Sequence, residues 1–249
     1  NAGIIATLTG SVVCQSLTVA ATGVCTIVGD LWVNGTVTNG GTVAVRGNVD
    51  VNIIANDGTM SVLGNVYAND NILNGDAAIT LAISGDCYIA GADLVNGATA
   101  AATCNLGING KVTIAIGDFI NRSSAATFTG PMVLFGGNVL ENQSVTRIWG
   151  SLAMAGGGIT AQLAGTVTIE GDVTECGGIT ATGTVTIHGN CTLTTGNANT
   201  GDAGVLVIDG NLTCANGGTG NGVTAAATGT IDVGGDLIVN NAGAAALVN

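Results

Sequence analysis

One short element recurs along the whole chain, and it limits the folds that are open to this sequence. The element is nine residues long and reads apolar, polar, apolar, any residue, glycine, polar, apolar, any residue, apolar. A repeat of this kind is typical of a solenoid, in which each copy packs only on its neighbours. We find about twelve copies, and their central glycines are Gly10, Gly29, Gly47, Gly64, Gly85, Gly110, Gly137, Gly150, Gly171, Gly189, Gly210 and Gly235.

The spacing of these glycines predicts how each coil is built. Successive central glycines are 13 to 27 residues apart, and the best-behaved intervals lie near 18, which divides into three sides of six residues. The segment Gly165–Thr182 reads as three such hexads with alternating apolar residues, which is the pattern of short β-strands. We therefore predict an all-β fold: a single β-solenoid (parallel β-helix) of about twelve coils with three short sides per coil, irregular in the middle. One domain would cover residues 1–249, with irregular coils or inserted loops at 91–150.

The repeat also predicts what each position does. We expect the central glycines to turn the chain sharply by adopting positive φ, and the Asp or Asn that follows to bond its own backbone. The alternation places a set of aliphatic residues inward: Val167, Ile169, Val173, Val185, Ile187, Leu193, Leu212 and Val239. It places Thr168, Glu170, Thr186 and His188 outward.

The hexads, the Gly-Asp and Gly-Asn corners and the apolar alternation resemble those of bactofilins, a family of β-helical proteins. The resemblance covers most of the chain and implies a subunit that polymerises end to end without nucleotide. It carries over no functional residue. Seven Cys and few Lys and Glu depart from cytosolic bactofilins and are more similar to extracellular fibre or sheath proteins, including the sheaths of filamentous methanogens.

Composition excludes some functions. The formal net charge is −12, from 16 acidic residues against four basic ones, so a nucleic-acid backbone would be repelled. No apolar run approaches the roughly 18 residues of a membrane span.

The chain starts at Asn1 without an initiator Met or a signal peptide, which is how a processed secreted protein would look. We expect an extracellular or cell-surface location.

One group of residues could carry chemistry. Glu170, His188 and Asp209 each precede a central glycine in three successive copies, so they would form an outward row about 5 Å apart. Such a row could act as an acid/base group or a weak metal site. The favoured interpretation is structural, because His188 separates two acids that would repel each other and no nucleophile accompanies them. We predict no catalytic, cofactor or metal site.

The cysteines and the glycosylation sequons offer further candidates. Cys14, Cys25, Cys87, Cys191 and Cys214 fall on inward positions, and no two share a position in adjacent coils, whereas Cys176 falls outside the inward set and is the best candidate for a cross-link. Asn-x-Ser/Thr sequons, which could carry glycans in a secreted chain, occur at Asn34, Asn121, Asn142, Asn190 and Asn211. Asn121 and Asn142 would be the easiest to modify, because an exposed loop is expected in their region.

Residues 91–150 concentrate bulky and basic side chains. They hold all three Phe (Phe119, Phe128 and Phe135), Trp149, Pro131 and three of the four bases. This concentration fits either an interaction surface or a local plug over an interrupted coil. Two Thr-x-Thr pairs, Thr166/Thr168 and Thr184/Thr186, would stack as a ladder of hydroxyl groups, which is a pattern of ice-binding faces. Valine replaces threonine in the next copy, at Val205/Val207, so the ladder is interrupted.

Three classes of function follow. The favoured one is a structural subunit that assembles with itself into an extracellular filament, sheath or surface coat, because the segments 1–9 and 240–249 are apolar and uncharged and so do not cap the solenoid. An adhesin or fibre-like carbohydrate-binding module is the alternative, with aromatic residues expected along one face and found only in the Phe119 to Trp149 region. A β-helical polysaccharide-degrading enzyme ranks last, because four bases and three Glu are few for such a groove.

Overall fold

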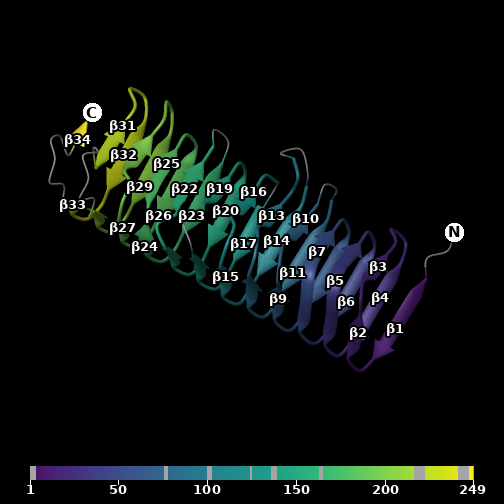
Figure 1. The fold of residues 1–249 in the computed structure, drawn as a ribbon. Coiled ribbons are helices and arrows are strands. Elements are labelled where there is room, and N and C mark those ends of the chain that lie inside the picture. Colours follow the sequence, from purple (N-terminus) through teal and green to yellow (C-terminus); the bar gives the residue numbers. More distant parts are fainter. Residues whose placement is uncertain are drawn as a thin grey trace. The chain divides into compact units, whose positions relative to one another are not determined.

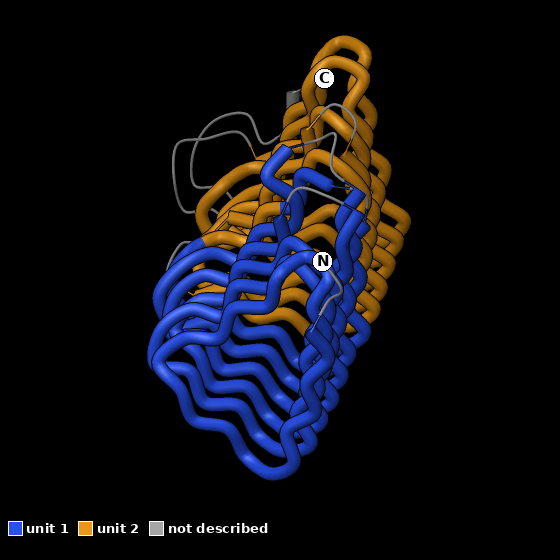
Figure 2. Tube along the Cα trace, turned by 90° about the vertical axis from the view of Figure 1, so that its right-hand side faces the viewer, with its two compact units in different colours: residues 1–117, 121–130 blue, residues 118–120, 131–249 orange. Residues whose placement is uncertain are grey.

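The structure is a computed structural model that describes residues 4–75, 78–99, 103–123, 125–135, 139–162, 165–215, 222–240 and 247–248. Within these ranges the regular secondary structure is all β-strand, and the strands pair in parallel from one coil to the next (Figure 1). The fold is therefore a parallel β-solenoid, which confirms the predicted fold class. The chain divides into two compact units, residues 1–117 with 121–130 and residues 118–120 with 131–249 (Figure 2). The expectation of a single domain stays a prediction.

The first unit contains coils with three sides. Its first side is formed by β1 (Ile5–Thr9), β4 (Val24–Val28), β6 (Thr42–Val45), β8 (Thr59–Val62), β11 (Thr80–Ile83), β14 (Asn105–Ile108) and β17 (Ala125–Phe128). The second side is formed by β2 (Val12–Cys14), β5 (Leu31–Asn39), β7 (Val49–Asn56), β9 (Val66–Ala68), β12 (Cys87–Ile89) and β15 (Val112–Ile114). The long strands β5 and β7 continue into the third side, where β3 (Leu17–Val19), β10 (Ile72–Asn74) and β13 (Leu94–Asn96) join them. Strand β16 (Phe119–Asn121) has residues in both units.

The second unit repeats this plan. Its first side is β20 (Val145–Ile148), β23 (Thr166–Ile169), β26 (Thr184–Ile187), β29 (Val205–Ile208) and β32 (Thr230–Val233). Its second side is β18 (Met132–Leu134), β21 (Leu152–Met154), β24 (Val173–Cys176), β27 (Cys191–Leu193), β30 (Leu212–Cys214) and β33 (Leu237–Val239). Its third side is β19 (Leu140–Asn142), β22 (Gly158–Ala161), β25 (Gly178–Ala181), β28 (Ala198–Thr200), β31 (Val223–Ala225) and β34 (Leu247–Val248).

The interior of each unit is filled by alternate strand residues. Seven of the eight predicted inward residues are fully buried, and Val239, in the last described coil, is half-buried. The predicted outward residues are half-buried or exposed, so the register is confirmed. Truncating one of the buried aliphatics to Ala would cost about 2 to 5 kcal/mol, because the neighbouring coils cannot close the cavity.

The reason for the corner glycines differs from the prediction. Among the described central glycines, positive φ occurs at Gly10 and not at the others. A Cβ on Gly29 would lie 2.5 Å from the backbone carbon of Gly10, and a Cβ on Gly189 would lie 2.7 Å from that of Gly171. Glycine is required because successive coils approach too closely for a side chain, so the predicted turn conformation was wrong at these corners.

The Asp and Asn residues that follow the corner glycines also behave differently from the prediction. At seven of these residues the side-chain oxygen accepts a hydrogen bond from the backbone N–H of the equivalent residue one coil later. Asp172 Oδ1 accepts from Asn190 at 2.7 Å, Asn190 Oδ1 accepts from Asn211 at 3.0 Å, and Asn211 Oδ1 accepts from Asp236 at 2.7 Å. These side chains therefore join neighbouring coils instead of closing their own turns.

One central glycine was assigned wrongly. Gly137 lies outside the described residues, and Gly130 holds the corner position of that coil, since a Cβ on it would lie 2.6 Å from the backbone carbon of Gly110. With Gly130 as the corner, Gly110, Gly130 and Gly150 are evenly spaced in the sequence. The irregular coils or inserted loops expected at residues 91–150 stay a prediction.

A buried ladder of asparagines closes the third side of the first unit, and sequence reasoning did not find it. Asn39, Asn56, Asn74, Asn96 and Asn121 are each at most 1% exposed. Each of the first four donates from Nδ2 to the Oδ1 of the next, over 2.8 to 2.9 Å. The second Nδ2 proton of the first four reaches a backbone carbonyl of a first-side strand, so the buried amides are satisfied.

Candidate functional site

The predicted acid, imidazole and acid row exists in the second unit. The three residues follow β23, β26 and β29, whose pairing places equivalent residues side by side. His188 Nδ1 lies 2.6 Å from Asp209 Oδ2, and its Nε2 lies 3.8 Å from Glu170 Oε2. The two nitrogens of the ring therefore face two carboxylates.

Arg147 and Trp149 extend this row at one end, a feature that the sequence interpretation missed. The Arg147 guanidinium pairs with Glu170 and lies 3.8 Å from the centre of the Trp149 ring. Arg147 and Trp149 are alternate residues at the end of β20, so both side chains point outward. The signal was available, because Trp149 precedes a central glycine as the acids and His188 do.

The row is a surface ion-pair network by its geometry. Its polar side chains are 23% to 54% exposed. Glu170 lies between Arg147 and His188, and His188 lies between Glu170 and Asp209. Within the described ranges, no group of three or more His, Cys, Asp or Glu residues is arranged to hold a metal ion. Exposed pairs of this kind contribute at most about 1 kcal/mol each. The arrangement favours the structural interpretation of His188.

The cysteines are thiols, and six of the seven are buried. Burial raises the pKa of Cys87 to about 12 and the pKa values of Cys176 and Cys214 to about 11. The expected exposure of Cys176 was wrong. The ladder shifts register between Val173 and Cys176, where Glu175 has a φ of 56°, and this bulge turns the Cys176 side chain into the core. Cys14 is half-buried and is the most accessible thiol.

The two sequons that were expected to be easiest to modify are the least accessible. Asn121 and Asn142 are fully buried, and the Asn142 amide donates to the backbone oxygens of Ser144 and Thr166. A glycan cannot be attached to these side chains in the folded chain. Asn190 and Asn211 are exposed but bond the next coil through Oδ1, and Asn34 is exposed on β5.

Residues 91–150 do not form one aromatic surface. Phe119 and Phe128 are the largest fully buried side chains, so they fill the core of their coils. Phe135 and Trp149 are about half-exposed. Phe119 and Phe128 therefore fit the interpretation of a local plug in the core, whereas Phe135 and Trp149 are accessible to solvent.

An aromatic column that was not predicted lies on the second side of the first unit. It consists of Trp32, Tyr67 and Tyr88, and the pairing of β5, β7, β9 and β12 places them in one line with Asp50. All three are exposed. The sequence repeat could have predicted this column, because each of the three aromatic residues stands three positions after a central glycine.

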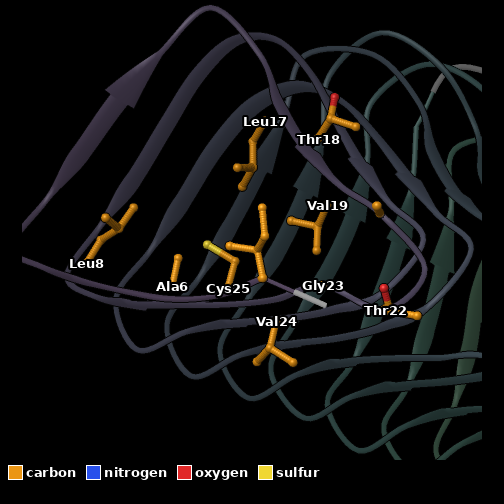
Figure 3. A pocket seen from close by; sticks show the side chains of 11 residues that line it. Ala6, Leu8, Leu17, Thr18, Val19, Thr22, Gly23, Val24 and Cys25 are labelled. Carbon is orange, nitrogen blue, oxygen red and sulfur yellow. The ribbon is translucent and has the colours of Figure 1, made fainter. Parts of the chain in front are cut away.

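The first coil of the first unit is open and apolar. Among the described strands of its sheet, β1 has β4 as its one neighbour. A cavity of about 510 Å³ opens there, with Ile4, Ala6, Leu8, Leu17 and Val19 among its lining residues (Figure 3). Ile4 and Leu8 are 80% and 40% exposed. The first coil therefore leaves apolar side chains of the solenoid interior uncovered.

Comparison with known proteins gives the chain no family: no family model, curated protein or solved structure matches it. None of the described segments forms a helix that is long and apolar enough to cross a membrane. The fold and surfaces define a parallel β-solenoid with one open apolar coil, a surface ion-pair row and an exposed aromatic column.

Proposed function

We propose that the chain is a structural subunit that assembles end to end with copies of itself into an extracellular filament, sheath or surface coat. The single observation that carries the proposal is the open first coil, where Ile4 and Leu8 are exposed and Ala6 is half-buried. Burying Ile4, Ala6 and Leu8 under another coil would gain about 25 cal/mol for each Å² of apolar surface removed from water.

The last described first-side strand offers a matching partner. In β1, Ala6 and Leu8 stand beside the buried Cys25 and Ile27 of the next coil. In β32, Ile231 and Val233 stand beside Leu206 and Ile208 in the same way. Because both strands carry the same alternation, β1 of one copy placed against β32 of another would continue both the parallel ladder and the apolar interior.

Charge supports the same contact. No acidic or basic residue occurs between Ile4 and Gly29, so the first coil adds no repulsion to a subunit whose net charge is −12. Edge strands that avoid pairing commonly carry charged residues, and β1 carries none. Polymerisation without nucleotide, as in the bactofilins that the sequence resembles, would follow from this geometry alone. The predicted contacts at residues 1–3, 241–246 and 249 lie outside the described residues.

Two matched double variants test the proposal. Ala6→Lys with Leu8→Lys places charges on the inward side of β1, whereas Thr7→Lys with Thr9→Lys places the same charges on the outward side of the same strand. We expect the inward variant to stay monomeric in sedimentation velocity and the outward variant to assemble like the unmodified chain. Far-UV circular dichroism checks that both fold. Equal assembly by the two variants would contradict the proposed contact.

The proposal assigns no catalytic role. The two carboxylates of the row, Glu170 and Asp209, are engaged with Arg147 and His188. An extracellular or cell-surface location accompanies the proposal, and exposed Asn34 is the sequon best placed to carry a glycan there.

A further inference from the structure

The aromatic column forms a straight row of exposed rings on one sheet face of the first unit. Trp32, Tyr67 and Tyr88 are 41%, 46% and 41% exposed. Trp32 is level with Asp50, Asp50 with Tyr67, and Tyr67 with Tyr88, on four successive strands. At about 4.8 Å between strands, the row is about 14 Å long.

The fold does not use these rings as core. Their neighbours along the strands, such as Leu31, Val33, Val66 and Ala68, are buried, so the rings project from the opposite face. Both tyrosines of the chain and one of its two tryptophans lie in this single row. Large aromatic side chains that remain exposed together are characteristic of binding surfaces.

Asp50 gives the row its polar character. It is exposed, and no described residue forms an ion pair or a side-chain hydrogen bond with it. It stands between Trp32 and Tyr67, so a ligand that covers both rings also passes over a free carboxylate. Together with the two tyrosine hydroxyls, it offers hydrogen-bond acceptors beside apolar ring faces.

We propose that the aromatic column binds a linear, uncharged polysaccharide that lies along the row. The C–H faces of pyranose rings pack on aromatic faces, and sugar hydroxyls donate hydrogen bonds to the Asp50 carboxylate and the tyrosine oxygens. A row of contacts one strand apart fits a chain of sugar units better than a single sugar. This site lies on the flank of the first unit, so its occupation does not depend on end-to-end assembly.

The charge of Asp50 favours a neutral polysaccharide over an anionic polymer or a protein surface. An anionic polymer would be repelled by Asp50 and by the acidic chain as a whole. A neutral or acidic protein surface, including a second copy of this chain, would bury Asp50 without a counter-charge, which is strongly unfavourable. A neutral glycan leaves water around the carboxylate and supplies hydroxyl donors, so it satisfies both parts of the row.

Binding of defined oligosaccharides tests the proposal. The probes are cellohexaose, chitohexaose and laminarihexaose, with polygalacturonate as the anionic probe and poly-lysine as the cationic one. The Trp149→Phe background leaves Trp32 as the one tryptophan, so its fluorescence reports on the row, and isothermal titration calorimetry gives the affinity. We expect at least one neutral hexasaccharide to bind and polygalacturonate not to bind.

Three single variants locate the site. Tyr67→Ala and Tyr88→Ala should each weaken binding by about tenfold or more, whereas Phe135→Ala removes an equally exposed aromatic outside the row and should leave binding unchanged. The Ala6→Lys/Leu8→Lys variant should bind as well as the unmodified chain, so a failure of assembly and a failure of binding are distinguishable. Binding of none of the three neutral probes, preference for poly-lysine, or equal effects of Tyr67→Ala and Phe135→Ala would overturn the proposal.

Discussion

Asn56 donates a hydrogen bond of 2.8 Å from Nδ2 to the Oδ1 of Asn74, which lies eighteen residues later in the chain and in the next coil. Both side chains are at most 1% exposed. Because both the Nδ2 donor and the Oδ1 acceptor of each amide are bonded, the ladder fixes which residues of successive coils lie side by side and keeps these side chains buried. A slip of one residue would bury unsatisfied amides.

The first prediction concerns this ladder. Asn74→Ala removes one acceptor of Asn56 Nδ2 and the donor to both Asn96 Oδ1 and the Asn105 carbonyl, so three hydrogen bonds of the ladder are lost. We expect a loss of about 2 to 4 kcal/mol in the free energy of unfolding. Urea denaturation in the Ala6→Lys/Leu8→Lys background would measure it without interference from assembly. Asn34→Ala, at an exposed asparagine, is the control and should change stability by less than about 0.5 kcal/mol. Equal effects of the two substitutions would contradict the ladder.

The second prediction concerns the close approach of the coils at the corners. In Gly189→Ala the new Cβ would lie 2.5 Å from Asp172 Oδ1 and 2.7 Å from the backbone of Gly171, and we expect a cost of about 1 to 3 kcal/mol. Gly107→Ala is the matched control, because no atom lies within 4 Å of its added Cβ. Thermal unfolding followed by circular dichroism should show a lower midpoint for Gly189→Ala and an unchanged or higher one for Gly107→Ala. A tolerated Gly189→Ala would show that the close approach of the coils does not require glycine at this corner.

Much of the fold follows from the sequence, since period-two alternation fixes which residues face the core and the glycines mark the corners. Val167 and Ile187 were placed correctly for this reason. The misassigned Gly137 shows the limit of this reasoning. A glycine-rich stretch offers several candidate corners, and the distance to the previous coil identifies Gly130 as the one that is used.

The candidate sites were less predictable, because they depend on how coils of unequal length align. The row of Glu170, His188 and Asp209 was found, since these coils have nearly equal length. Cys176 was misplaced because a bulge at Glu175 reverses its direction, and a bulge leaves no mark in a period-two pattern. Asn121 was taken for a loop residue because successive members of the ladder are 17 to 25 positions apart, with no constant spacing.

The third prediction uses the thiols. Because burial raises the pKa values of Cys87, Cys176 and Cys214 above the ordinary 9.0, these groups stay protonated and shielded at pH 8. We expect iodoacetamide to label Cys14 first in the native chain and all seven cysteines after unfolding in urea. Peptide mass spectrometry identifies the labelled positions. Early labelling of Cys176 would restore it as a surface cross-linking candidate.

The same thiols predict how stability changes with pH. A thiol whose pKa is raised in the folded state contributes stability that is fully present below its unfolded pKa, near 9.0. That contribution is lost as the pH rises through the folded values of about 11 to 12. We expect the urea midpoint to fall between pH 9 and 11, and a Cys87→Ala variant to show a smaller fall than the unmodified chain. An identical fall in both would exclude Cys87 as a cause.

The fourth prediction concerns the ion-pair row. His188→Ala should change the free energy of unfolding by less than about 1 kcal/mol, because His188 and Asp209 are exposed and Glu170 is partly exposed. The adjacent residue gives the contrast: Ile187 is fully buried, and Ile187→Ala should cost about 2 to 5 kcal/mol. Chemical denaturation of both variants measures the two losses in the free energy of unfolding. A large loss from His188→Ala would show that the row holds the coils together.

The most direct test of the account is the assembly state of the unmodified chain. Sedimentation velocity over a range of concentrations, with negative-stain images of the same samples, would measure it. The open first coil and the matching alternation of β1 and β32 predict species that grow with concentration and appear as ordered filaments or sheets. A chain that remains a monomer at every concentration would contradict the structural role.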